Sequence, residues 1–354
     1  MNCLLHIGSY ALIFFSMKIG FAYNIKNKNP STKLEEQDEQ EYDSPEVIKM
    51  ISDAIKELGH KVIPVKANGN AYEELKSVVG KVDLVFNIAE GVHADARESQ
   101  VPFYCEVLKI PYTHSTPTTH AIGLDKLFTK LLLKGVGVKV PSSILVSSAE
   151  DPIGRIKFPV IIKPNSEGSS IGIMNDNVVS DKKSLKRRLE KVYASGYTGK
   201  YLVEEYIEGR EFTVSILGNN PPRILPIVEQ KFNFLPEGYH KIAGYELKWF
   251  LEDKLKNLKE AYDCPAKIEP ELEKKIHKVC LLTYETLRVL DCARIDFRLN
   301  EKGELYLLEI NTLPGLNFDE KIISYFPLAA RTAGLKPKDV VGAIIDGARE
   351  RWGI

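Results

Sequence analysis

Residues 292–315 read CARIDFRLNEKGELYLLEINTLPG, and they hold the most informative pattern of the chain. In an extended strand, residues two apart lie on one face. Arg294 with Asp296, and Glu309 with Asn311, therefore form two pairs that each share a face. Two such pairs predict a single polar cluster.

The loop between the pairs determines how the strands would meet. If residues 300–303 form a four-residue hairpin turn, Leu299 pairs with Glu304, and this register places all four polar side chains on one face. Carboxylate and amide oxygens suit Mg²⁺, which takes its other ligands from water and phosphate. The guanidinium would stabilise charge on a phosphoryl group or a tetrahedral intermediate. A solvated charged face is the alternative, but the neighbouring apolar residues favour burial, and buried carboxylates need a partner or a metal.

Residues 163–172, KPNSEGSSIG, place a lysine at the end of a predicted strand before a loop of small residues. Such a loop lets backbone N–H groups approach phosphate oxygens closely. It matches neither the P-loop nor the GxGxxG pattern, and on glycine content alone an ordinary hairpin turn is the better explanation.

Two further charged positions allow more than one interpretation. Lys126 could be an ordinary exposed lysine at a helix start. Glu204-Glu205 could be surface charge or a hinge that reads a nucleobase.

Amino-acid composition limits the classes of protein to which the chain could belong. The 354 residues are 44% hydrophobic and 27% charged, which predicts a compact multidomain protein. Lys plus Arg equals Asp plus Glu at 48 each, so no net field favours nucleic acid or an anionic membrane. Five cysteines without a CxxC pair argue against a disulfide framework or a zinc site, and the histidines show no metal-binding spacing. A cytoplasmic setting fits best.

The N-terminal stretch 3–16 is apolar but too short to span a bilayer, and it lacks a basic n-region. Met17 begins a predicted strand. We expect translation to start at Met17 and residues 1–16 to be an upstream extension; a signal or anchor is the alternative.

The order of predicted elements indicates three domains. In residues 17–120, strands alternate with helices as in a parallel α/β sheet, with a helix over Pro45–Leu58 capped by Ser44. Residues 121–210 form a small α+β unit that begins with a helix over Leu124–Gly135. Residues 211–354 form an α+β domain with an antiparallel sheet.

Six motifs in order resemble the D-alanine:D-alanine ligases of the ATP-grasp superfamily, from about Ile110 to the C-terminus. They are LDK at 124–126, KP and EGSS within 163–170, VEEY at 203–206, EFTV at 211–214, RID at 294–296, and LEINT with PG within 308–315. Their order and spacing carry the resemblance. It implies an α/β, three-domain ATP-grasp fold that uses ATP and two Mg²⁺ ions, with Mn²⁺ as an alternative.

The resemblance also implies roles for individual residues. Those expected to bind ATP are Lys126, Lys163, Ser169, Ser170, Glu204, Glu205, Ile207, Glu211 and Lys248. Those expected to bind metal are Asp296, Glu309 and Asn311. The catalytic set is Arg294 and the amide of Gly315 at the oxyanion, Ser169 in the closing loop, and Glu41 as the equivalent of the glutamate that holds the first substrate's ammonium.

The implied reaction starts with phosphorylation of a carboxylate by ATP. The amine of a second amino acid then attacks the acyl phosphate, giving an amide or peptide, ADP and phosphate. A ligase for another amino acid or amine, an ATP-grasp kinase without a ligation step, and a silent nucleotide-binding partner are the alternatives. The resemblance further implies small-molecule amino-acid substrates and a homodimer. The charge balance predicts no nucleic-acid partner, and the short N-terminal stretch predicts no stable membrane span.

Departures from the family concentrate in the amino-acid pocket. The first substrate loop is replaced by residues 24–43, and residues 89–98 exchange small and acidic groups for larger ones. Trp249 stands where the family has tyrosine, and an indole only donates hydrogen bonds. The family's serine-leucine end becomes residues 317–320, NFDE, whose acids would repel a carboxylate. The second substrate therefore need not be D-alanine.

Overall fold

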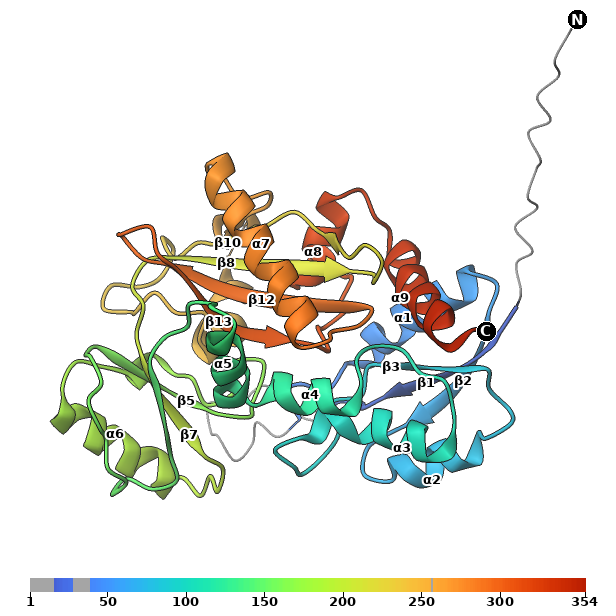
Figure 1. Cartoon of the computed structure of the whole chain (residues 1–354), viewed down its shortest axis with the longest axis horizontal. Coiled ribbons are helices and arrows are strands. Elements are labelled where there is room, and N and C mark those ends of the chain that lie inside the picture. The colour runs from blue at the N-terminus through green and yellow to red at the C-terminus, as the bar shows by residue number, and fades with distance from the viewer. Residues whose placement is uncertain (1–15, 28–38, 256) are drawn as a thin grey trace, which may run out of the picture.

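Three β-sheets follow one another along the chain in the computed structural model (Figure 1), which describes residues 16–27, 39–255 and 257–354. Apart from Ser16, the expected upstream extension lies outside these residues. No helix in the described part of the chain is both long and apolar enough to cross a membrane.

The first sheet is parallel, with strand order β2-β1-β3. Its strands are β1 (Lys18–Tyr23), β2 (Lys61–Lys66) and β3 (Leu84–Asn87). The helices of this region are α1 (Pro45–Glu57), α2 (Ala71–Ser77), α3 (Gln100–Leu108) and α4 (Pro117–Leu124). The predicted N-cap is confirmed, because the Ser44 side chain accepts the Val47 N–H. The parallel α/β prediction is likewise confirmed.

The second sheet is antiparallel, with strand order β4-β7-β5-β6. Its strands are β4 (Ser143–Val146), β5 (Val160–Pro164), β6 (Val178–Val179) and β7 (Tyr201–Glu205), and α6 (Lys182–Ala194) accompanies them. Buried residues of the strands and of α6 form one apolar cluster. The glycine-rich residues lie in the connection 165–177 between the paired antiparallel strands β5 and β6, which is much longer than an ordinary hairpin turn.

The third sheet is antiparallel and follows the order β11-β10-β8-β12-β13, with β9 beside β8. Its strands are β8 (Arg210–Leu217), β9 (Arg223–Ile224), β10 (Val228–Gln230), β11 (Tyr262–Asp263), β12 (Cys292–Leu299) and β13 (Leu305–Asn311). The helices are α5 (Lys126–Gly135), α7 (Pro270–Thr286), α8 (Tyr325–Thr332) and α9 (Pro337–Trp352). The helix expected over Leu124–Gly135 is interrupted at Asp125, which ends α4 and caps α5.

The two faces of β12 have opposite characters. Ala293, Ile295 and Phe297 are fully buried in a cluster with residues of α5 and α7. Arg294 and Asp296 alternate with them and therefore project from the other face of the sheet. The packing of α7 on one face thus presents the charged residues on the opposite one.

The hairpin between β12 and β13 is one residue longer than predicted. Leu299 pairs with Leu305 instead of Glu304. The Asn300 side chain explains the longer loop, because its Oδ1 accepts the backbone N–H groups of Lys302 and Glu304 at 3.0 and 2.9 Å. Alone, this shift of one residue would turn the polar residues of β13 to the wrong face.

A register shift between Asp296 and Phe297 reverses that effect. Beyond it, Asp296 lies opposite Glu309, and Arg294 lies opposite Asn311. The predicted register was therefore wrong, while the prediction that the four polar residues share a face holds because the bulge restores their parity.

The cores cross the predicted domain boundaries, which themselves remain a prediction. One apolar cluster joins β1 and α1 to α8 and α9, and α1 and α9 lie together in Figure 1. Another joins Leu133 and Val138 of the predicted central segment to the third sheet. The four cysteines in the described region are free: Cys105, Cys264, Cys280 and Cys292.

His114 lies where the first and last parts of the chain meet. Its side chain is fully buried, its backbone N–H donates to Asp291 Oδ2 at 2.7 Å, and its carbonyl accepts from Arg351. Burial, together with the nearby His120 and Arg351, lowers the pKa of His114 to about 3. Between pH 6.5 and 3 the unfolded chain therefore binds the extra proton, so stability falls as the pH falls through this window.

Acidification from pH 6.5 to 5 should remove about 2 kcal/mol of stability through His114. We expect a plot of unfolding free energy against pH, from urea denaturation, to be flatter for His114→Gln. His277→Gln, on the surface of α7, serves as the control and should keep the native slope. A native slope in His114→Gln would contradict the assignment.

Candidate active site

Two cavities adjoin the charged face of β12 and meet at Lys248, Arg294 and Tyr325. The first, the hairpin cavity, measures about 620 Å³ including space open to solvent, and predicted site residues in its wall include Lys163, Ser170, Glu211, Asp296 and Glu309. The second is the acidic-loop cavity, named after residues 40–43, the acidic loop, which line it. It measures about 1400 Å³ on the same basis, and predicted site residues in its wall include Glu41, Ser169, Asn311 and Gly315. The structure thus gathers most of the predicted site around one junction.

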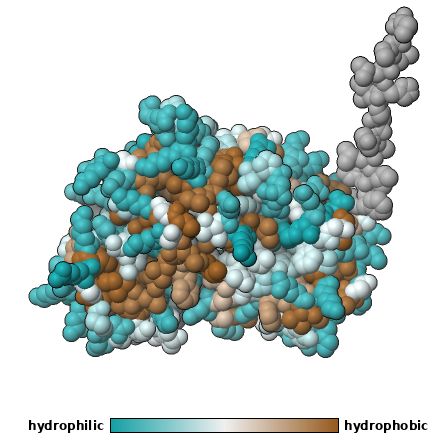
Figure 2. Space-filling view, viewed as in Figure 1, coloured by the Kyte–Doolittle hydropathy of each residue, from teal (hydrophilic) through white to brown (hydrophobic). Residues whose placement is uncertain are grey.

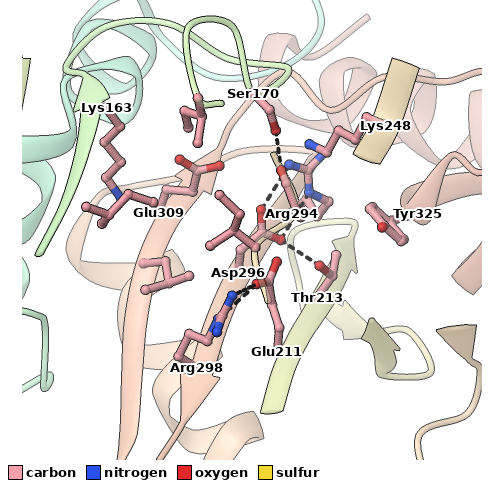
Figure 3. A pocket seen from close by; sticks show the side chains of 15 residues that line it. Lys163, Ser170, Glu211, Thr213, Lys248, Arg294, Asp296, Arg298, Glu309 and Tyr325 are labelled. Carbon is pink, nitrogen blue, oxygen red and sulfur yellow. Dashed lines mark hydrogen bonds and ion pairs between the residues drawn. The ribbon is translucent and has the colours of Figure 1, made fainter. Parts of the chain in front are cut away.

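The centre of the hairpin cavity is an arginine–aspartate pair (Figure 3). Arg294 Nε and Nη2 lie 3.2 and 3.0 Å from the two oxygens of Asp296, and Thr213 Oγ1 donates to Asp296 Oδ1 at 2.9 Å. The Lys248 side chain points toward the same centre. Burial lowers the pKa of Lys248, and the nearby Arg294 lowers it further.

Glu309 brings a second carboxylate beside Asp296. Burial alone would raise the pKa of Glu309, but the surrounding Lys126, Lys163, Arg294 and Lys248 lower it to about 2. The side chain is therefore anionic at neutral pH. Lys126 Nζ lies 3.6 Å from Glu309 Oε2, which places Lys126 beside the cavity.

These residues form a donor set that fits Mg²⁺. Asp296 and Glu309 face each other across the strand pair, and Asn311 follows two residues later, its Oδ1 accepting the Leu313 N–H at 2.9 Å. In the described part of the chain, no group of three His, Cys, Asp or Glu side chains could hold a metal. Two carboxylates and an amide suit an ion that completes its shell with water and phosphate.

Lys163 belongs to a buried charged triad that the sequence did not reveal. Glu204 Oε1 accepts from Lys163 Nζ at 2.7 Å, and Glu204 Oε2 lies 3.0 Å from Lys130 Nζ. Lys130 is 2% exposed, and burial lowers its pKa to about 8. It lies one helical turn after Lys126, a spacing that could have suggested a shared face.

The other residues predicted to bind ATP form several kinds of contact. The Glu204 carboxylate is bound by the two lysines, and Glu205 lies 3.5 Å from Lys157. Glu211 forms an ion pair with Arg298 at 2.6 Å, and the carbonyl of Ile207 accepts from the same guanidinium. Arg298 was not predicted, although it lies two residues beyond Asp296 on β12.

The glycine-rich loop adopts a conformation that is uncommon for non-glycine residues. Ser169 and Ser170 have positive φ angles of 47° and 60°. Ser170 Oγ donates to the Ala243 carbonyl at 2.6 Å, and Trp249 Nε1 donates to the Ser169 carbonyl at 3.3 Å. The indole acts as a donor here, as expected.

Three of the carboxylates that line the acidic-loop cavity have different environments. Glu41 is ion-paired with Arg97. Burial raises the pKa of Asp43 to about 7, although nearby Lys26 acts to lower it. Burial also raises the pKa of Glu90, with Glu41 and others adding to the effect, and Glu90 has no hydrogen-bond or ion-pair partner among the described residues.

The far wall of this cavity differs from the expectation at residues 317–320. Asn317 lines the cavity, but Phe318, Asp319 and Glu320 do not. Lys321 and Ser324 lie in the wall instead. The loss of a hydroxyl and the gain of repelling acids stay a prediction, while Ser324, whose Oγ donates to the Gly315 carbonyl at 3.3 Å, brings a hydroxyl to this wall.

Antiparallel sheets around a cavity of lysines, carboxylates and a serine-containing loop define an ATP-dependent ligase of the ATP-grasp class. A family profile described as D-ala D-ala ligase C-terminus matches residues 139–346. The chain belongs to the D-alanine–D-alanine ligase family.

Individual relatives agree with this assignment. A D-alanine–D-alanine ligase of Carboxydothermus hydrogenoformans is 33% identical over 82% of this chain and 89% of its own length. The uncharacterized protein y4sG of Sinorhizobium fredii is 32% identical over 84% of this chain and 86% of its own length. The fold matches the crystal structure of D-alanine–D-alanine ligase from Bacillus anthracis complexed with ATP, with a TM-score of 0.70, 22% identity, and coverage of 95% of this chain and 98% of that one.

Proposed function

We propose that the protein joins the carboxyl group of one amino acid to the amine of a second, with D-alanine as the first substrate to test. The observation that carries this proposal is the meeting of the two cavities at Lys248, Arg294 and Tyr325. A nucleotide phosphate in the hairpin cavity and a carboxylate in the acidic-loop cavity would approach each other there. The family relation supports D-alanine, since the relative from Carboxydothermus hydrogenoformans is named a D-alanine–D-alanine ligase.

The protein's own residues would then act on both reactants. Lys126, Lys163 and Lys248 would offset the repulsion between the carboxylate and the polyphosphate. Arg294, with the amide of Gly315, would stabilise the oxyanion formed when the amine attacks the acyl phosphate. Ser169 and Ser170 belong to the loop that would exclude water from this intermediate.

We assign the metal to Asp296, Glu309 and Asn311, whose hard oxygens suit two Mg²⁺ ions. When bound, Mg²⁺ supplies positive charge to the phosphate oxygens. Glu211 and the backbone near Ile207 would hold the adenosine portion, and the Glu204 carboxylate would act indirectly by positioning Lys163. Glu205, which is paired with Lys157, would offer its backbone.

Glu90 is the better candidate than Glu41 to receive the ammonium of the first substrate. The Glu41 carboxylate already binds Arg97, whereas Glu90 lines the same cavity without a partner among the described residues. A cationic ligand would compensate the burial that raises the pKa of Glu90.

Glu90→Gln should raise the KM for the first amino acid about 10²-fold and leave the KM for ATP within about 3-fold, because one charged hydrogen bond is lost. Steady-state kinetics with each substrate varied in turn would measure both values. Glu106→Gln on α3 is the matched control, since it lies outside the cavity. An unchanged amino-acid KM would return the role to Glu41 or Asp43.

The test of the reaction is release of ADP and phosphate from ATP and Mg²⁺ across single and paired D- and L-amino acids, with products identified by mass spectrometry. D-alanyl-D-alanine alone would support D-alanine as substrate, and a different amide would name another pair. ADP release and a phosphorylated acceptor without any amide would instead identify a kinase.

A homodimer in the cytoplasm is also part of the proposal. Large apolar side chains of α3 and α5 are exposed, including Phe103 (53%), Phe128 (59%) and Leu131 (55%). Figure 2 shows hydrophobic residues gathered where Figure 1 places α5. A second copy of the chain could cover such a surface.

A further inference from the structure

One arginine joins three segments that are distant in sequence. Arg97 Nη2 forms an ion pair with Glu41 Oε2 of the acidic loop and lies 3.2 Å from Glu167 Oε2 of the glycine-rich loop. Its Nη1 donates to the Ser166 carbonyl at 2.6 Å. The Arg97 side chain is only 10% exposed, so these contacts are shielded from water.

Neighbouring carboxylates keep the Arg97 guanidinium positively charged. Burial acts to lower the pKa of Arg97, but Glu41, Glu167 and Glu98 outweigh burial and raise it. Attraction between charges is stronger in a shielded site than on the surface. Removing the guanidinium would leave the Glu41 and Glu167 carboxylates close together without their nearest cation.

The glycine-rich loop is held against the acidic loop at the same place. A Cβ atom at Gly168 would lie 2.0 Å from Glu41 Oε1, so the two loops are in direct contact there. The Glu167 carbonyl accepts from Lys126, and the Tyr197 hydroxyl lies 3.3 Å from Glu167 Oε1. The loop that Arg97 binds is therefore also in contact with Lys126, which is predicted to bind phosphate.

We propose that Arg97 is a positioning residue that holds the glycine-rich loop closed and couples it to the amino-acid cavity. Glu41 lines that cavity, so an amino acid bound there would exclude water from the Arg97–Glu41 pair and strengthen it. The stronger pair favours the closed loop and therefore tighter nucleotide binding. By reciprocity, nucleotide binding favours the amino acid equally. The coupling rests on the proposed function; the closed loop does not.

Hydrogen exchange of the full chain without ligands tests the loop. The Ile171 and Ile173 N–H groups are bonded within the loop to the carbonyls of Gly168 and Ser170. Arg97→Met should raise exchange in a peptide covering 165–173 at least about 10-fold, and Arg97→Lys should restore part of the protection. Unchanged exchange in Arg97→Met would overturn the proposal.

The matched control is Arg351→Met on α9. The Arg351 side chain is 22% exposed, lies 2.8 Å from Asp291 Oδ1, and lines neither cavity. Its loss should leave the exchange of 165–173 unchanged. Equal effects of the two variants would point to general destabilisation and contradict a specific role for Arg97.

Equilibrium binding of a non-hydrolysable ATP analogue, with and without D-alanine, tests the coupling. In the native protein, D-alanine should lower the Kd of the analogue about 5- to 50-fold, and Arg97→Met should reduce this ratio to below about 2. A ratio that persists in Arg97→Met, or is absent in the native protein, would overturn the coupling. If loop protection depended on Arg97 but no amino-acid pair were ligated, the proposed function would be refuted and the positioning role of Arg97 would remain.

Discussion

Replacing Asp296 with asparagine should reduce kcat about 10²- to 10³-fold while leaving the fold intact. The carboxylate receives Arg294 through two contacts and Thr213 through a third, and it lies opposite Glu309. The amide keeps the volume but removes the charge that both Arg294 and a bound cation require. The effect should therefore appear in kcat and in the Mg²⁺ concentration needed for half-maximal rate.

Release of ADP during turnover of the identified substrates is the measurement. Asp263→Asn is the control, because Asp263 lies in the same sheet on β11, pairs with Lys231 at 2.8 Å, and lines neither of the two cavities. It should retain native activity. If Asp296→Asn kept a kcat within about 2-fold of native, the metal assignment and the role of the Arg294 pair would both be wrong.

Replacing Glu204 with alanine should destabilise the protein by about 3–5 kcal/mol, because it leaves two buried ammonium groups without their nearest carboxylate. Glu204 is 1% exposed and lies within 3.0 Å of both Lys163 and Lys130. Ser143 Oγ also donates to it at 3.0 Å. Even with this carboxylate present, burial lowers the pKa of Lys130 to about 8, so without it one lysine should lose its proton near neutral pH.

Urea denaturation followed by tryptophan fluorescence and by circular dichroism would measure the loss. Glu205→Ala is the matched control on the same strand, because Glu205 pairs only loosely with the exposed Lys157, and it should cost less than about 0.5 kcal/mol. The double change Glu204→Gln with Lys130→Met should recover part of the loss, since fewer buried charges are then unpaired. Equal stabilities of Glu204→Ala and Glu205→Ala would refute the buried triad.

The sequence predicted the parts of this site that depend on local periodicity. The shared face of Arg294 and Asp296 follows from the two-residue repeat of a strand, which tertiary context rarely changes. The register of the hairpin was not predictable in the same way. It depends on the Asn300 side chain inside the turn and on a bulge after Asp296, and neither leaves a distinct sequence pattern.

The charged residues that the sequence analysis missed have a different property in common. Each forms an ion pair with a residue far away in the sequence. Lys130 meets Glu204 74 positions later, and Arg97 meets Glu41 56 positions earlier. Nothing local distinguishes such a charged residue from one on a solvated surface. The same limit explains Glu41, which resemblance assigned to a substrate ammonium and the structure places against an arginine.

The shared core of α1 and α9 has a consequence for how the chain matures during synthesis. Ile51 and Ile55 of α1 pack in the same cluster as Ile344 and Ile345 of α9. A ribosome adds residues from the N-terminus onward, so the first sheet leaves it long before its final covering helix exists. The apolar surface of α1 that α9 covers therefore stays exposed until α9 has been synthesised, and a nascent chain stalled before α9 is the form that a chaperone would most readily bind.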